Sequence, residues 1–150
     1  MATIHLVLQG KGGVGKSMIA ALIAQYQLTK GKRPLCLDTD PVNASFQAYK
    51  GLPVTRLNIL QDEEIDPRSF DQLVELISQA NGDVVIDNGA SSFVPLSAYL
   101  ITNHVPALLQ SLSHQIVVHT VITGGQAQSD TLHGFTQLVK QFPPDVSFVV

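Results

Sequence analysis

The sequence predicts an α/β fold of three layers, in which helices cover both faces of a mainly parallel sheet. Short apolar runs rich in β-branched residues alternate with segments in which apolar residues recur at helical spacing. The short runs are apolar throughout rather than at every second position, which is typical of parallel strands buried on both faces. No repeat or linker interrupts this pattern, so we expect one domain over residues 1–150.

The first expected strand, residues 3–8, leads into a glycine-rich turn at residues 10–15. From Lys16 onward the apolar spacing becomes helical, and a basic last turn with a glycine ends this helix at Lys30 and Gly31. We expect the helix to bury one apolar face against the sheet. That face comprises Ile19, Leu22, Ile23 and Tyr26.

The later elements repeat this alternation. A second strand, residues 34–37, ends in Asp38-Thr39-Asp40-Pro41. Asp66-Pro67 provides the N-cap and the first position of a helix that stops at Asn81-Gly82. The other expected strands are residues 57–60, 83–87, 115–122 and 146–150. The other expected helices are residues 95–103, 106–113 and 129–141.

Composition excludes several classes of protein. Apolar residues form 45% of the 150 and charged residues only 14%, which argues against a disordered tail and a coiled coil. A net charge of −3 provides no basic footprint for nucleic acid, and one cysteine cannot support a disulfide framework. No apolar run is long enough to span a membrane, so we expect a cytoplasmic protein. Because the sequence ends within an apolar strand, we expect this to be the N-terminal part of a longer domain.

The turn after the first strand carries the strongest functional signal. Residues 10–17 fit the pattern G-x-x-x-x-G-K-[ST] between a strand and a helix, which is typical of a P-loop. Glycines let backbone N–H groups surround a polyphosphate, while Lys16 reaches the outer phosphates and Ser17 ligates Mg²⁺. The expected nucleotide-binding residues are Gly10, Lys11, Gly12, Gly13, Val14, Gly15, Lys16, Ser17 and Met18.

A dinucleotide-binding turn is the alternative for this segment. The same residues satisfy G-x-G-x-x-G, and Asp38 follows about 20 residues after the turn, where such domains carry an acid for the ribose. A pyrophosphate between two nucleosides has no terminal phosphate for a lysine and Mg²⁺ to hold. Lys16 and Ser17 therefore favour a nucleoside triphosphate.

Acidic residues end two of the expected strands, and a second lysine lies early in the loop. Asp38 and Asp40 follow the second strand, and Asp87 ends a later one. In a parallel sheet these ends face the phosphate-binding turn, where carboxylates support Mg²⁺ or orient a water, although such acids are also ordinary caps and turn formers. Lys11 is either an ordinary surface lysine or places its positive charge beside a phosphate. That phosphate could belong to a nucleotide bound by a second subunit.

Together these segments resemble the ParA/MinD ATPases. Residues 11–17 resemble the family's deviant Walker A motif, K-G-G-x-G-K-[ST], residues 38–41 its D-x-D-P segment and residues 84–87 its Walker B strand. The resemblance implies a SIMIBI-class P-loop NTPase fold, Mg²⁺-dependent ATP hydrolysis and a sandwich homodimer that forms with ATP. The implied catalytic residues are Lys11, acting in trans, Lys16, acting in cis, and Asp40, which positions the attacking water. The implied metal-supporting residues are Ser17, Asp38 and Asp87.

Two segments depart from the family pattern. The family often continues D-x-D-P-Q-G-N, whereas Asn43 comes one residue early, and Asn88-Gly89-Ala90-Ser91 replaces the common T-P-P. With these features the chain most resembles plasmid-encoded conjugal-transfer TraL proteins, which implies a protein partner in plasmid transfer or partition. The altered segment after Asp87 also leaves open a scaffold that retains nucleotide without turnover.

Overall fold

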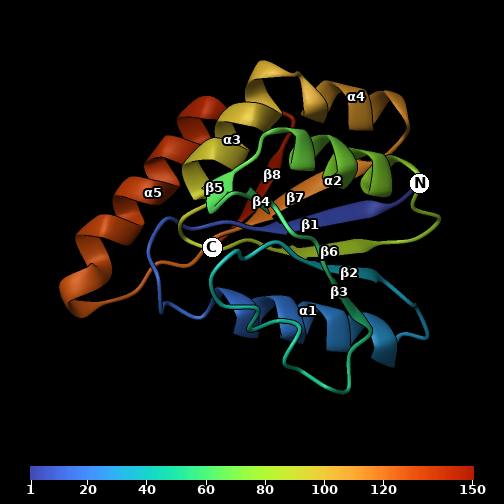
Figure 1. Cartoon of the computed structure of the whole chain (residues 1–150), viewed down its shortest axis with the longest axis horizontal. Coiled ribbons are helices and arrows are strands. Elements are labelled where there is room, and N and C mark those ends of the chain that lie inside the picture. Colours follow the sequence, from blue (N-terminus) through green and yellow to red (C-terminus); the bar gives the residue numbers. More distant parts are fainter.

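Six parallel strands form the central sheet of the computed structural model, which describes all 150 residues. In sheet order they are β3 (Val54–Arg56), β2 (Leu35–Asp38), β6 (Val84–Asp87), β1 (Thr3–Val7), β7 (Gln115–His119) and β8 (Ser147–Val149). Since all six run the same way, their carboxyl ends meet at one edge of the sheet, on the left in Figure 1. This is the edge at which open parallel sheets bind ligands.

Helices cover both faces of the sheet, as Figure 1 shows. One face carries α1 (Lys16–Thr29), and the other carries α2 (Arg68–Ser78), α3 (Phe93–Thr102), α4 (Val105–Ser111) and α5 (Gln128–Gln141), which follows the 3₁₀ turn η1 (Gly125–Ala127). The chain leaves β1 toward β3 and later returns toward β8, so right-handed crossovers place α1 opposite the later helices. The prediction of a three-layer fold with a mainly parallel sheet is confirmed.

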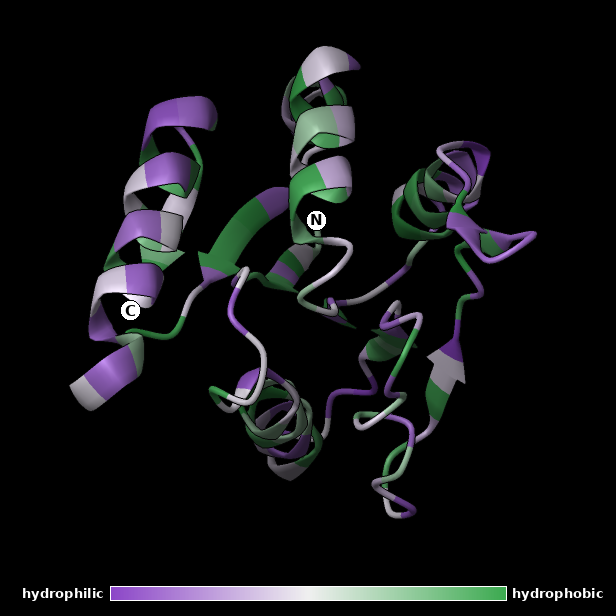
Figure 2. Ribbon diagram, turned by 60° about the vertical axis from the view of Figure 1, so that its left-hand side comes forward, coloured by the Kyte–Doolittle hydropathy of each residue, from purple (hydrophilic) through white to green (hydrophobic).

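Two hydrophobic clusters hold the three layers together. The larger lies between the sheet and the helices from α2 to α5, and it includes Ile4, Phe70, Leu73 and Leu96. The smaller lies between the sheet and α1. Figure 2 shows hydrophobic residues, in green, concentrated on the strands and on the helix faces that turn toward them. The sheet is therefore apolar on both faces, which is the burial expected of parallel strands.

The face that α1 buries differs from the expected one. Ala20, Ala21 and Ala24 are completely buried, whereas Leu22 and Tyr26 are 53% and 60% exposed. The prediction that large residues form the buried face was wrong for these two positions. The three alanines pack against the buried face of the sheet in one cluster with Val7, Cys36 and Val85.

The segment between β2 and α2 also differs from the expectation. The expected strand at residues 57–60 is wrong, because the chain pairs with β2 earlier, as β3. Leu57 and Ile59 are nevertheless buried, and a hairpin of β4 (Leu60–Gln61) and β5 (Glu64–Ile65) follows them. Residues of β3 are mostly exposed at the sheet edge, so their sequence shows little of the apolar pattern of a buried strand.

Two histidines form a contact that their positions in the sequence conceal. His5 lies on β1 opposite Val117, and His119 lies two residues further along β7, opposite Val7. Nδ1 of His5 and Nε2 of His119 are 2.9 Å apart. Burial lowers the pKa of His119 to about 4, and the neighbouring His5 acts in the same direction. Burial also lowers the pKa of His5. Both shifts favour the neutral rings, of which one donates to the other.

Substitution of Ala24 by leucine should destabilise the protein, because the larger side chain has no space between α1 and the sheet. Overpacking of this kind costs about 1–3 kcal/mol, which would lower the midpoint of urea denaturation. Leu22→Ala on the same helix is the matched control, and its effect should be within about 0.5 kcal/mol, as for other exposed positions. Equal losses at both positions would contradict the burial of the alanine face.

Candidate nucleotide-binding site

The P-loop, residues 10–17, joins β1 to α1 and leaves its backbone donors unused. Gly13 and Gly15 adopt positive φ angles of 71° and 101°, which residues with side chains disfavour. No backbone N–H from Lys11 to Met18 donates a hydrogen bond within the chain. These donors precede α1 and form its first turn, where the helix dipole adds positive potential. The loop is therefore suited to surround an anion.

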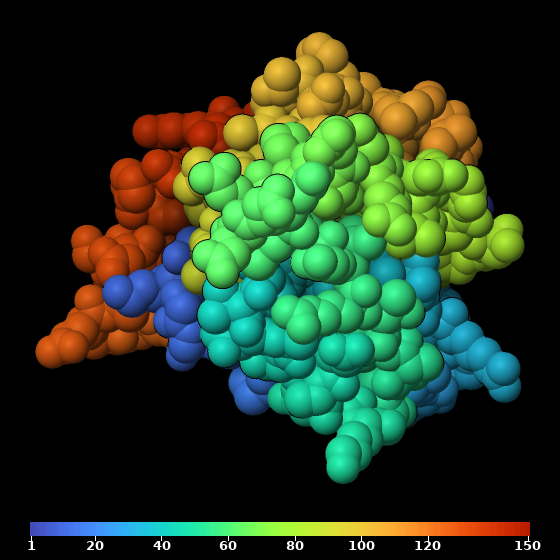
Figure 3. Space-filling view, in the orientation of Figure 1, coloured from blue at the N-terminus to red at the C-terminus, as the bar shows by residue number.

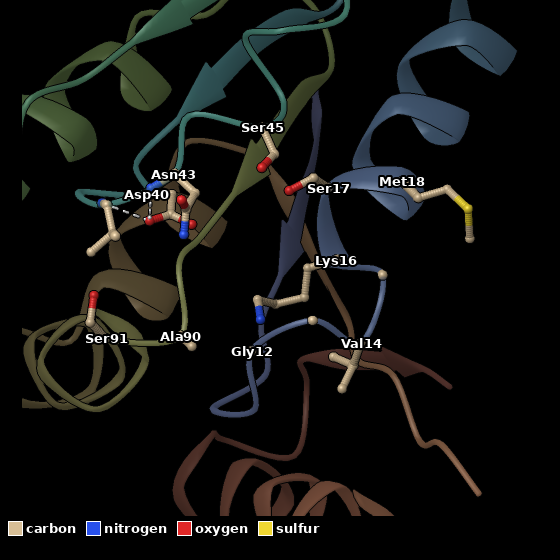
Figure 4. Close-up of a pocket in the computed structure, with 13 residues that line it drawn as sticks. Gly12, Val14, Lys16, Ser17, Met18, Asp40, Asn43, Ser45, Ala90 and Ser91 are labelled. Carbon is tan, nitrogen blue, oxygen red and sulfur yellow. Dashed lines mark hydrogen bonds between the residues drawn. The ribbon is translucent and has the colours of Figure 1, made fainter.

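Lys16 is the first residue of α1, and its side chain points back into the P-loop. Its Nζ donates to the backbone oxygen of Lys11 at 2.7 Å, and Figure 4 shows the side chain extending toward Gly12. Burial lowers the pKa of Lys16, whereas the carboxylates of Asp87 and Asp40 act in the opposite direction. A phosphate oxygen would offer this ammonium an ionised acceptor, with which hydrogen bonds are stronger than with a carbonyl.

A cavity of about 510 Å³ opens above the P-loop. Its other walls come from the β2 loop (residues 39–47) and the β6 turn (residues 88–92), as Figure 4 shows. In Figure 3 the P-loop, in blue, and the β2 loop, in cyan, lie side by side on one face of the molecule. The lining residues are residues 12–18 with Asp40, Val42, Asn43, Ser45, Ala90 and Ser91. The volume is that of a site for a small ligand.

The hydroxyl of Ser17 donates to Oδ2 of Asp87 at 2.5 Å. The other carboxylate oxygen, Oδ1, is buried without a hydrogen-bond partner. Burial raises the pKa of Asp87 to about 6, which the hydrogen bond from Ser17 partly counteracts. An unpaired buried oxygen beside a hydroxyl is a donor set that fits Mg²⁺, a cation that prefers oxygen ligands and binds through few protein groups.

Asp38 and Asp40 organise the β2 loop. The two carboxylate oxygens of Asp38 accept the backbone N–H groups of Asp40 and Gln47, each at 3.0 Å. Asp40 accepts the N–H groups of Val42 at 2.9 Å and Asn43 at 3.0 Å, both through Oδ1. Asp38 is fully buried, and burial raises its pKa while the backbone hydrogen bonds act in the opposite direction.

The residues expected to support a metal therefore have different hydrogen-bond partners in the structure. Ser17 and Asp87 are in contact, while Asp38, at the paired position on β2, directs its oxygens to the loop backbone. No group of three or more His, Cys, Asp or Glu side chains comes together in a way that could hold a metal ion. A cation bound by Ser17 and Asp87 would take its remaining ligands from phosphate oxygens and water.

Gly10 and Lys11 lie outside the main cavity, unlike the other expected nucleotide-binding residues. They border a neighbouring hollow of about 260 Å³ beside α5. There Nζ of Lys11 forms an ion pair with Oδ2 of Asp130 at 2.8 Å, and both side chains are about half exposed. Lys11 lowers the pKa of Asp130. The sequence indicates no partner for Lys11, because Asp130 is 119 residues away.

Gln9 directly precedes the P-loop and holds its first residue, Gly10, by a hydrogen bond. This residue was not predicted from the sequence. Its buried side chain donates to the backbone oxygens of Val121 at 2.9 Å and Thr131 at 3.1 Å, and accepts the N–H of Gly10 at 2.9 Å. The side chain of Gln9 lies against Gly134 in α5, where a Cβ would be 2.3 Å from its Oε1. A glycine within a helical pattern was the available signal for this close approach.

A glycine-rich loop with free N–H groups, set at the carboxyl edge of a parallel sheet, defines a P-loop nucleotide-binding protein. The family described as "CobQ/CobB/MinD/ParA nucleotide binding domain" matches residues 5–140. The chain belongs to this family, which confirms the resemblance drawn from the motifs.

Several proteins are similar in sequence to this chain, two of them over its whole length. Two proteins named TraL from Escherichia coli are each 67% identical to all 150 residues, which correspond to 62% of their own length. Protein MobD of Acidithiobacillus ferrooxidans is 30% identical over 142 residues, 93% of this chain and 57% of MobD. The arsenical pump-driving ATPase of Acidiphilium multivorum is 37% identical over 70 residues, 43% of this chain and 12% of that protein.

A solved structure supports the fold. The signal recognition particle receptor FtsY from Elizabethkingia anophelis, in complex with GDP, matches with a TM-score of 0.51 at 21% sequence identity. The match covers 91% of this chain and 46% of the FtsY chain. Within the chain, no helix is both long and apolar enough to cross a lipid bilayer.

Binding of nucleotide with Mg²⁺ should weaken as the pH falls through about 6. The pKa of Asp87 is raised to about 6, and its carboxyl has to lose that proton before it can ligate a cation. Below this pH the Mg²⁺-dependent part of the affinity should fall by up to about tenfold per pH unit, because one proton competes with the cation. Calorimetry with a non-hydrolysable triphosphate, with and without Mg²⁺, measures this part.

Asp87→Asn is the control, because an amide does not titrate in this range. The triphosphate itself binds protons, so the decisive quantity is the difference in pH dependence between the two proteins. Identical pH profiles would exclude Asp87 as the group that meets the cation.

Proposed function

We propose that the chain is the nucleotide-binding core of a Mg²⁺-dependent ATPase that works as a dimerisation switch. The proposal depends on one arrangement above all: unpaired P-loop N–H groups lie beside Lys16 and beside the Ser17–Asp87 pair with its orphan oxygen. The N–H groups and Lys16 would bind the outer phosphates, and Ser17 with Asp87 would hold Mg²⁺, which neutralises phosphate charge when bound.

ATP is the proposed nucleotide. Over 70 residues the chain is 37% identical to a protein named as an ATPase. In hydrolysis, Asp40 would orient the attacking water, because it lines the cavity and uses only one carboxylate oxygen for backbone N–H groups. A carboxylate in this position acts by placing the nucleophile in line with the bond to be broken.

Lys11 would act on a nucleotide held by a second subunit. Its side chain lies outside the cavity of its own chain and extends to the surface, where only an exposed ion pair holds it. A cation supplied in trans is a known means of stabilising the charge that develops during phosphoryl transfer. Two subunits facing each other across their P-loops would therefore complete each other's sites.

The similarity to TraL and MobD proteins supports a role in plasmid transfer or partition. We propose a protein partner from such a system and a cytoplasmic location. The remaining alternative is a scaffold that binds nucleotide without turnover. Phosphate release from the full-length protein, measured with its partners present, separates the two, because a scaffold releases none under any condition.

Replacement of Lys16 by alanine should abolish nucleotide binding, because its ammonium is the one side-chain cation that lines the cavity. We expect the dissociation constant for ATP, measured by calorimetry, to rise at least about 100-fold, the loss of roughly two charge-assisted hydrogen bonds. Lys140→Ala, an exposed lysine at the far end of α5, should bind as the wild type does. Unchanged binding by Lys16→Ala would make the site assignment wrong.

Replacement of Lys11 or Asp40 by alanine should leave ATP bound and slow its hydrolysis. Loss of a cation acting in trans reduces the turnover rate by about 10³-fold or more, and Lys11→Ala should also fail to dimerise with ATP. Asp40→Ala should still dimerise, since its Lys11 is intact. Phosphate release and sedimentation velocity measure the two effects. A Lys11→Ala protein with normal turnover would argue against the proposed switch.

A further inference from the structure

Three buried polar side chains lie directly behind the cavity wall. Thr39 precedes Asp40 in the β2 loop, while Asn88 and Ser92 begin and end the β6 turn. None of the three is more than 1% exposed. Polar groups are costly to bury unless they are hydrogen-bonded, so the partners of these side chains determine what they do for the two segments.

Asn88 connects the β2 loop to the β6 turn. Its Oδ1 accepts hydrogen bonds from the hydroxyls of Thr39 at 3.1 Å and Ser92 at 2.7 Å. Its Nδ2 donates to the backbone oxygen of Gly89 at 3.2 Å. The Thr39 hydroxyl also lies 3.0 Å from the backbone oxygen of Asp87. Both ends of the Asn88 amide are thus satisfied in a buried network, an arrangement that makes the surrounding backbone rigid.

A second contact joins the same two segments. A Cβ at Gly89 would lie 2.6 Å from the carboxyl carbon of Asp40, so the Asp40 carboxylate rests directly on the backbone of the β6 turn. Through Oδ1, Asp40 in turn holds the N–H groups of Val42 and Asn43, which line the cavity. A movement of the β6 turn would therefore displace the lining part of the β2 loop.

The beginning of α3 belongs to the same unit. Ser92 occupies the N-cap position of α3, yet its side chain makes no capping hydrogen bond. A serine at this position ordinarily accepts a hydrogen bond from the first turn of the helix. Here the hydroxyl lies within hydrogen-bond distance of Asn88 and of the backbone oxygen of Gly89 instead. Asn88 thus connects the β2 loop, the β6 turn and the start of α3.

We propose that Asn88 is a positioning residue that makes the β2 loop and the β6 turn respond as one unit to a triphosphate in the cavity. The proposal rests on the proposed function, because it takes the occupant to be a nucleoside triphosphate. Asp40 and Asn43 lie on one wall and Ala90 and Ser91 on another (Figure 4), so a phosphate beyond the P-loop would meet both segments. Asn88 is buried behind both walls and accepts hydrogen bonds from Thr39 in the β2 loop and Ser92 in the β6 turn.

Amide hydrogen exchange of the full-length protein tests this coupling. The wild-type protein is measured alone, with ADP, and with a non-hydrolysable ATP analogue. Either nucleotide should slow exchange in the P-loop, and the analogue should further slow exchange in the β2 loop and the β6 turn together, by about tenfold or more. In Asn88→Ala the P-loop should remain protected, while the β6 turn loses the protection that is specific to the triphosphate.

Thr39 provides variants that change the network less. Thr39→Val removes the hydroxyl with little change in shape and should reproduce the decoupling, whereas Thr39→Ser keeps the hydroxyl and should behave as the wild type. A purely structural role would change exchange without nucleotide, but not the difference between the analogue and ADP.

The outcomes separate this proposal from the proposed function. Joint protection of both segments in Asn88→Ala and Thr39→Val would overturn the role of Asn88. If Asn88→Ala does not fold, the comparison of Thr39→Val with Thr39→Ser decides alone. A wild-type P-loop that neither nucleotide protects would instead refute the proposed function itself.

Discussion

The hydrogen bond between Ser17 and Asp87 joins the first turn of α1 to the end of β6, and the site depends on it. It lies at the carboxyl edge of the sheet, where the P-loop, with its free N–H groups, lines a cavity whose other walls are the β2 loop and the β6 turn. Burial raises the pKa of Asp87 although the hydrogen bond from Ser17 acts in the opposite direction, and the second carboxylate oxygen has no partner. The proposed phosphate site and the proposed cation site would thus share the Ser17–Asp87 contact.

Features that depend on neighbouring residues could be predicted from the sequence. The spacing of the glycines indicated a loop whose backbone N–H groups could surround a polyphosphate, and in the structure the N–H groups of residues 11–18 have no partner within the chain. The strand ends that carry Asp38 and Asp87 were expected at the same sheet edge, and the register pairs them. Such features are encoded within a few residues of one another, or follow from the common direction of parallel strands.

Features that depend on residues far apart in the chain could not be predicted. Leu22 and Tyr26 follow helical spacing as a buried face would, but the distance from α1 to the sheet selects alanines, and spacing alone contains no distance. Residues such as Asn88 carry no pattern that identifies their partners, since Thr39 and Asn88 meet only after β2 and β6 pair. An acidic residue at the end of a predicted strand likewise does not indicate its hydrogen-bond partners, and the Asp38 carboxylate accepts backbone N–H groups of the β2 loop.

The contact between Gln9 and Gly134 has a consequence for how sequences of this kind can change. The amide of Gln9 occupies the volume that a side chain at position 134 would take. Its hydrogen bonds to the backbone oxygens of Val121 and Thr131 join the segment after β1 to the segment after β7 and to α5. A helix-favouring alanine at position 134 would favour the helical state of α5 itself, yet it would displace the Gln9 amide from its hydrogen bonds. In homologous proteins, a larger residue at position 134 is therefore expected to be accompanied by a change at position 9, which would link the segment before the P-loop to a distant helix.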